Sequence, residues 1–135
     1  MIFRDNPLED RHPRAFAAAI AAQCAATAGK FWEMNERLLR DPVELSDGAL
    51  ARDAREIGID PAKFESCVGD AAVAQRIRDG MKEAVNVGVR GTPIFVIGVR
   101  RPGESTVHAL RMIEGAHPYE VFKTTLDGVI RSRTP

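Results

Sequence analysis

The stretch Gly88-Val89-Arg90-Gly91-Thr92-Pro93-Ile94-Phe95-Val96-Ile97-Gly98 marks where the period of the sequence changes, and this change decides the fold. Up to Gly88, apolar residues recur at three- and four-residue steps, which is the period of helices. After Pro93, the continuous apolar run from Ile94 to Ile97 is typical of a strand buried on both faces. The sequence therefore predicts a helical part followed by a part that contains a sheet.

The residues after this strand predict how the chain closes. The turn-rich segment from Arg100 to Ser105 leads into strand-like residues from Val107 to Glu114, so we expect an antiparallel hairpin. A last helix has Pro118 in its first turn. Its apolar residues form one stripe, which we expect to close the domain: Tyr119, Phe122, Leu126, Val129 and Ile130.

Upstream of Gly88, the sequence predicts a short strand and five helices. Ile2 and Phe3 are strand formers, and the turn signal Asp5-Asn6-Pro7 follows them. Capping residues and glycine stops then bound the helices. We expect them over residues 14–29, 30–39, 46–58, 60–68 and 70–88.

The composition fits one soluble globular domain, with 135 residues, 44% hydrophobic content, and 19 basic against 19 acidic residues. Because no long basic block is present, we expect no nucleic-acid partner. The alanine-rich run from Ala15 to Ala22 is far shorter than the roughly 20 residues that span a bilayer, so we expect no membrane partner. The first residues lack the basic and apolar regions of a secretory signal.

Several segments together resemble the DsbA-like branch of the thioredoxin superfamily. They are Phe3-Arg4-Asp5-Asn6-Pro7-Leu8 with His12-Pro13, Gly29-Lys30-Phe31-Trp32-Glu33-Met34, Gly88-Val89-Arg90-Gly91-Thr92-Pro93, and Gly115-Ala116-His117-Pro118-Tyr119-Glu120-Val121-Phe122. The resemblance implies a DsbA-like α/β fold, a truncated thioredoxin-like fold with a helical insertion. Residues 1–135 would form a single domain that lacks its first β-α unit, and approximately residues 13–88 would form the insertion.

The resemblance also implies a substrate site at Thr92 and Pro93. In the family, the matching proline is cis and lies against the active-site dithiol, and the backbone of the preceding residue pairs with a bound peptide. Because a cis peptide bond occurs in only ~5% of X-Pro bonds in folded proteins, a chain that keeps one usually needs the backbone groups it exposes. The alternative is an ordinary loop that ends in a proline at the start of a strand.

The family's redox chemistry depends on a Cys-x-x-Cys at a helix N-terminus, which lowers the pKa of the attacking thiol. No segment of this chain matches that motif, so no catalytic residue can be carried over. The motif follows the central strand of the family's sheet, whose absence would leave strand edges exposed. We therefore expect a fragment or truncated product that associates with itself; a first strand that moves inward is the alternative.

The two cysteines, Cys24 and Cys67, match positions in the helical insertion where the family often has cysteine. A bridge between them would be a structural disulfide, whereas two buried thiols would act as small apolar residues. Helix faces alone give no distance between them, so both alternatives stay open. His12, His108 and His117 lack the spacing of a zinc site, and we expect neither a metal nor a cofactor.

Two functions follow from this pattern. The first is a DsbA-like thiol-disulfide oxidoreductase whose recorded chain is redox-inactive by itself, with thiol- or disulfide-bearing peptides or proteins as partners. The second is a non-catalytic peptide- or protein-binding module that forms a homo-oligomer through its incomplete sheet. The family resemblance suggests a periplasmic or otherwise exported location, which the sequence itself does not decide.

Overall fold

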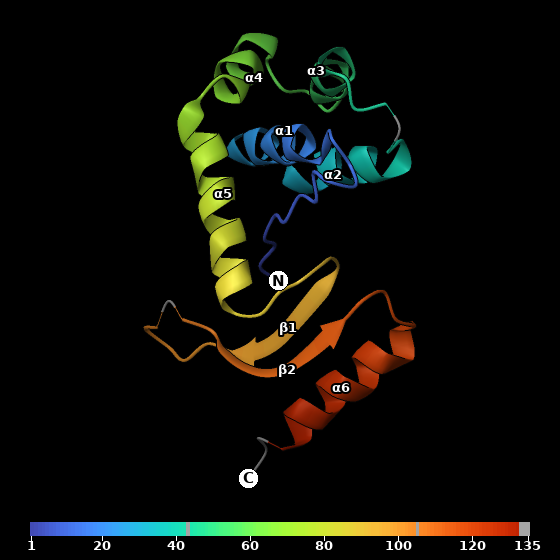
Figure 1. The fold of residues 1–135 in the computed structure, drawn as a ribbon, viewed down its shortest axis with the longest axis vertical. Coiled ribbons are helices and arrows are strands. Elements are labelled where there is room, and N and C mark those ends of the chain that lie inside the picture. Colours follow the sequence, from blue (N-terminus) through green and yellow to red (C-terminus); the bar gives the residue numbers. More distant parts are fainter. Residues whose placement is uncertain (43, 105, 133–135) are drawn as a thin grey trace. The chain divides into compact units, whose positions relative to one another are not determined.

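The computed structural model describes residues 1–42, 44–104 and 106–132, so Ser105 of the predicted turn lies outside the described residues. The chain divides into two compact units, Met1–Gly88 and Val89–Pro135. The described part of the first unit carries five helices, and that of the second carries a two-stranded hairpin and a helix (Figure 1). The hairpin and all six predicted helices are therefore confirmed.

The first unit is built around one alanine-rich helix, α1. Its small side chains let other helices approach on several sides, and Ala21, Ala22 and Ala25 are fully covered. Met34, Phe64 and other apolar residues of the surrounding helices complete the core. The helices are α1 (Ala15–Thr27), α2 (Phe31–Arg40), α3 (Asp47–Glu56), α4 (Pro61–Val68) and α5 (Ala71–Asn86).

The ends of these helices follow the capping signals of the sequence. The side chains of Ser46, Asp60 and Asp70 each accept a hydrogen bond from a backbone N–H in the first turn of their helix. Gly29 and Gly88 follow α1 and α5 with φ of 71° and 86°, in the left-handed region that glycine adopts without strain.

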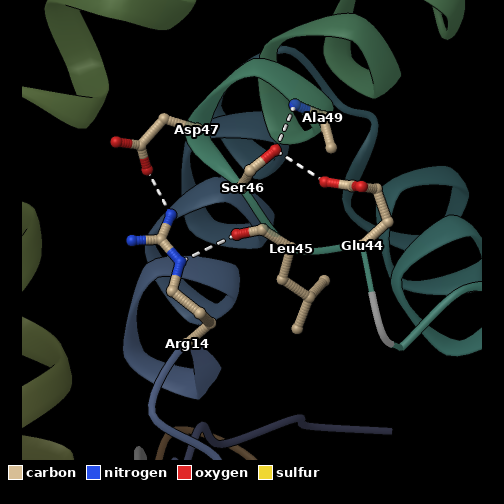
Figure 2. Close-up of polar contacts among 6 residues, drawn as sticks. All are labelled: Arg14, Glu44, Leu45, Ser46, Asp47 and Ala49. Atoms are coloured by element: carbon tan, nitrogen blue, oxygen red, sulfur yellow. Dashed lines mark hydrogen bonds and ion pairs between the residues drawn. The ribbon is translucent and has the colours of Figure 1, made fainter.

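A polar cluster joins the start of α1 to the start of α3. Figure 2 shows Arg14, whose Nε donates to the carbonyl oxygen of Leu45 over 2.8 Å and whose guanidinium pairs with Asp47. Beside it, the Ser46 hydroxyl donates to Glu44 over 2.6 Å. These contacts hold residues 44–47 at the start of α1.

The strand predicted at Ile2–Phe3 is wrong, because residues 1–8 form no regular secondary structure. A strand needs a hydrogen-bonded neighbour, and the two described strands pair with each other. Phe3 instead packs edge-on against Phe31 and Trp32, with ring centroids 5.2 Å and 6.1 Å away. Trp32 is 52% exposed, so the rings form a cluster at the surface of the first unit.

The second unit consists of β1 (Ile94–Val99), β2 (His108–Glu114) and α6 (Tyr119–Arg131). The strands are antiparallel, with Ile94 opposite Glu114 and an irregularity between Ile97 and Gly98. The prediction that β1 is buried on both faces is wrong, since Phe95 and Val96 are exposed. The described residues supply two strands and one helix to this unit, too few to cover both faces of the sheet.

The last helix forms as predicted, yet its apolar stripe does not close the domain. Phe122 packs on Phe95 with ring centroids 4.8 Å apart, which places α6 against one face of the hairpin. Tyr119 and Leu126, by contrast, are exposed, and no described residue of α6 is buried.

Candidate functional site

The loop Gly91-Thr92-Pro93 leads directly into β1, and the Thr92–Pro93 peptide bond is cis. Thr92 and Pro93 are both exposed. The carbonyl oxygen of Pro93 accepts a hydrogen bond of 2.8 Å from the backbone N–H of Gly115, which follows β2. The loop is thus fixed to the hairpin at its Pro93 end, while its side chains face outward.

This hydrogen bond sets the direction of the backbone groups along β1. In an antiparallel pair, successive residues direct their N–H and C=O groups alternately toward the partner strand and away from it. Because Pro93 points its carbonyl toward β2, Phe95 and Ile97 also face β2. The backbone groups of Ile94 and Val96 therefore point to the other edge of β1, which no described strand of this sheet occupies.

One apolar face of the hairpin is exposed beside this edge. Val96 lies directly opposite Met112, and the two side chains are 48% and 45% exposed. Leu110, two residues before Met112, is also exposed. Sequence reasoning missed this pair, because the signal lies in the strand register, which the apolar pattern of either strand alone does not contain.

The second unit contains two of the three histidines of the chain. Both histidines of the second unit are engaged: His108 Nε2 lies 2.6 Å from a carboxylate oxygen of Glu104, and His117 Nε2 lies 2.9 Å from the carbonyl oxygen of Glu114. The two cysteines of the sequence lie in the first unit, so the second unit has no thiol.

The structure joins Cys24 and Cys67 in a disulfide with a Cα–Cα distance of 5.7 Å. Cys24 lies near the C-terminal end of α1 and is only 2% exposed, whereas Cys67 lies in the last turn of α4 and is half-buried. The sequence left a disulfide and two free thiols as alternatives, and the structure contains the disulfide. It lies in the first unit, whereas Thr92 and Pro93 lie in the second.

Two other features are absent from the described residues. No helix there is both long and apolar enough to cross a bilayer. Nor do three or more histidine, cysteine or acidic side chains gather there in a group that could hold a metal ion.

Comparison with known proteins gives the family and a set of relatives. The chain is 38% identical over 81% of its length to Na⁺/H⁺ antiporter NhaA 3 of Salinispora tropica, and 39% identical over 76% to Na⁺/H⁺ antiporter NhaA 1 of Mycolicibacterium vanbaalenii. A protein named Na⁺/H⁺ antiporter NhaA from Herminiimonas arsenicoxydans is 31% identical over 67%. The chain spans only 17% of the length of the first two.

No solved structure matches the chain significantly. The model of one protein family, the DSBA-like thioredoxin domain, matches residues 2–127, which is nearly the whole sequence. The family match covers the helical unit, the Thr92–Pro93 loop, the hairpin and most of α6. The chain therefore belongs to the DSBA-like thioredoxin domain family.

Proposed function

We propose that this chain is the peptide-holding part of a DsbA-like thiol-disulfide oxidoreductase and is redox-inactive by itself. The observation that carries the proposal is the edge of β1 that no described strand of its sheet occupies and that begins at the exposed Thr92–Pro93 loop. The family's reaction needs a Cys-x-x-Cys dithiol, which these 135 residues do not contain. In that reaction a thiolate attacks a substrate disulfide and forms a mixed disulfide, which a second thiol resolves.

An extended peptide fits such an edge by adding as a further strand. Thr92 precedes β1, and the backbone groups of Ile94 and Val96 point away from β2, so they are available as donors and acceptors for a peptide. The main chain would bind the peptide irrespective of its sequence, which suits an enzyme that acts on many proteins. The exposed pair Val96 and Met112 would add apolar contact with the peptide's side chains.

The redox part of the proposal is tested by insulin reduction with dithiothreitol as the electron source. We expect the 135-residue chain to leave the rate at that of dithiothreitol alone, because its two cysteines form a bridge within the first unit and no Cys-x-x-Cys is present. A Cys24→Ala/Cys67→Ala chain serves as the control. If the wild-type chain accelerates insulin reduction and this variant does not, the Cys24–Cys67 pair is itself a redox centre, which contradicts the proposal.

The binding part is tested by titrating the chain with an extended, disulfide-bearing peptide and following backbone amide shifts. We expect shifts at Thr92, Ile94 and Val96. The Val96→Pro variant removes an N–H that points away from β2 and should weaken binding about fivefold, the value of one net hydrogen bond. Val96→Ala keeps the N–H and is the matched control. Equal losses in both variants would assign binding to the side chain and contradict the edge model.

A second candidate is a non-catalytic binding module that pairs with its own copies. The specific observation in its favour is the apolar surface of Val96, Leu110 and Met112 beside an unoccupied strand edge, since such edges pair readily with other chains. Sedimentation at rising concentration should then show dimers that Met112→Lys disrupts and Thr124→Lys, on the exposed side of α6, does not. A monomer at every concentration would exclude this candidate.

The names of the relatives add one more proposal about partners. Because this chain corresponds to 17% of those Na⁺/H⁺ antiporters, we propose that it represents a thioredoxin-like part that accompanies such a transporter, and not the part that moves ions. Co-purification with an NhaA-type antiporter expressed in the same cells would support this association. If the chain does not co-purify with the antiporter after mild detergent extraction, the result would contradict this association.

A further inference from the structure

The Cys24–Cys67 disulfide has one covered end and one accessible end. Cys24 is 2% exposed in the core between the helices, and Cys67 is half-buried near the end of α4. A thiolate breaks a disulfide by attacking one of its two sulfurs, and access decides which sulfur is attacked. Burial therefore directs an incoming thiol to Cys67.

A cleft of about 620 Å³ within the first unit leads to this accessible end. Cys67 is among the residues that line it, whereas Cys24 is not. The cleft lies among the end of α1, the helix α4 and the start of α5, and its volume is large enough for a small peptide-sized molecule. Cys67 is thus the half of the disulfide that borders the cleft.

The charged groups of the cleft favour an anionic ligand. Lys63 and Arg76 line it with exposed cationic side chains. The acidic lining residue is Asp70, whose carboxylate caps α5 by accepting a hydrogen bond of 2.8 Å from the backbone N–H of Ala72. Two cations against one engaged carboxylate leave a net positive charge beside the disulfide.

We propose that Cys67 is a site of reversible S-thiolation by a small thiol that carries carboxylates. The thiolate sulfur forms a bond to Cys67 Sγ, the Cys24–Cys67 bond breaks, and the electron pair of that bond goes to Cys24 Sγ, which takes a proton from solvent. The small thiol is oxidised to a mixed disulfide and Cys24 is reduced. The reverse attack by Cys24 expels the small thiol and restores the bridge.

This site belongs to the first unit and does not depend on the proposed peptide-holding function. It would make the bridge between α1 and α4 responsive to the thiol pool around the protein. Such a role goes beyond that of a permanent structural bridge, because opening the disulfide leaves the redox state of Cys67 set by the surrounding thiols.

The proposal is tested on the oxidised full chain with reduced glutathione, a tripeptide thiol with carboxylates, under native conditions. After acid quenching and alkylation, mass spectrometry of proteolytic peptides locates the glutathione adduct. We expect the adduct on Cys67 and the alkyl group on Cys24. An adduct on Cys24, equal amounts on both cysteines, or no adduct unless the chain is denatured would overturn the proposal.

The role of charge is tested by comparing glutathione with the cationic thiol cysteamine and with neutral 2-mercaptoethanol. Removing both cations by Lys63→Ala with Arg76→Ala should slow glutathione by roughly two- to fivefold and leave 2-mercaptoethanol unchanged. Lys82→Ala with Arg90→Ala, at exposed basic residues outside the cleft, is the matched control. Equal slowing of all three thiols would indicate a structural effect and contradict the proposed recognition of anionic thiols.

Discussion

Asp5 is the acidic residue whose surroundings most oppose its charge. It lies in the irregular N-terminal segment and accepts a hydrogen bond of 2.5 Å from the side-chain amide of Gln23 on α1. Burial raises the pKa of the Asp5 carboxyl, and the hydrogen bond from Gln23 only partly offsets this. The charged carboxylate therefore lowers the stability of the folded chain at neutral pH.

The Asp5→Asn variant should be more stable than the wild type at neutral pH. A raised folded-state pKa means that the folded chain holds the proton more tightly, so the destabilising contribution grows as pH rises through that pKa and vanishes below the unfolded value. Asn keeps an oxygen that accepts from Gln23 and removes the charge. Urea unfolding across the acidic range should show the advantage of the variant disappear as pH falls.

The informative quantity is the difference in unfolding free energy between the variant and the wild type, because other carboxyl groups change stability with pH in the opposite direction. Hydrogen bonds lower the pKa of Glu33, Glu44 and Asp127, so their contributions are lost as pH falls. Asp10→Asn, at an exposed carboxyl in the following turn, is the matched control. A similar gain in stability from Asp10→Asn would contradict the assignment to Asp5.

Gly98 occupies the irregularity in β1 where a side chain has no room. A Cβ there would lie 2.5 Å from the backbone oxygen of His108 and 2.7 Å from a methyl carbon of Val107. We expect Gly98→Ala to destabilise the hairpin by about 1–3 kcal/mol, because the partner backbone must shift. Hydrogen exchange of the hairpin amides should accelerate accordingly.

Gly128 in α6 is the matched control for Gly98, since a Cβ there meets no atom within 4 Å. In the interior of a helix, Gly128→Ala should stabilise by up to about 1 kcal/mol. Faster hairpin exchange in both variants would mean that any added methyl group loosens this unit. The close approach of Gly98 to the His108 backbone would then not be the cause of the faster exchange.

At the scale of elements, α3 depends on one capping side chain. The Ser46 hydroxyl accepts a hydrogen bond of 3.3 Å from the Ala49 N–H and also donates to Glu44, as Figure 2 shows. Ser46→Ala should lower the free energy of unfolding by about 1 kcal/mol, measured by urea denaturation. Ser46→Asn keeps a capping oxygen and should lose much less. Equal losses would assign the effect to the hydroxyl's contact with Glu44.

The elements also show which parts of the fold can be predicted from sequence. Helices with local signals, such as the caps at Ser46 and Asp60 and the stop at Gly88, were predicted within a few residues, because the determining residues are neighbours in the chain. Burial was not predicted correctly. The sequence pattern predicts that Val96 is a core residue, yet it is half exposed, because its burial depends on how many strands lie beside it.

For the candidate site, the residues could be predicted from the sequence, but their geometry could not. Residue identity was enough to find Thr92 and Pro93 through the family resemblance. The outward direction of the backbone groups at Ile94 and Val96 depends on the pairing of Pro93 with Gly115, a contact between residues 22 positions apart. The Cys24–Cys67 bridge needed the packing of α1 on α4 as well, which helix faces alone do not give.

At the scale of the whole molecule, the disulfide links α1 to α4 through two cysteines that are 43 residues apart in sequence. On the chain-entropy estimate, closing a loop of this length stabilises the folded state by about 4 kcal/mol. The Cys24→Ala/Cys67→Ala chain should therefore lose about that much free energy of unfolding in urea. The hairpin of the second unit contains no cysteine, so its hydrogen exchange below the global unfolding limit should be unchanged.

The wild-type chain with its disulfide reduced separates the effect of the bond from that of the lost sulfur atoms. If loop closure is the cause, reduction alone should destabilise nearly as much as the double substitution. The difference between the two is then the packing of the two thiols, of which Cys24 is the buried one. A reduced chain as stable as the oxidised one would mean that the core around α1 holds α4 without the bond. The bridge would then contribute little to stability.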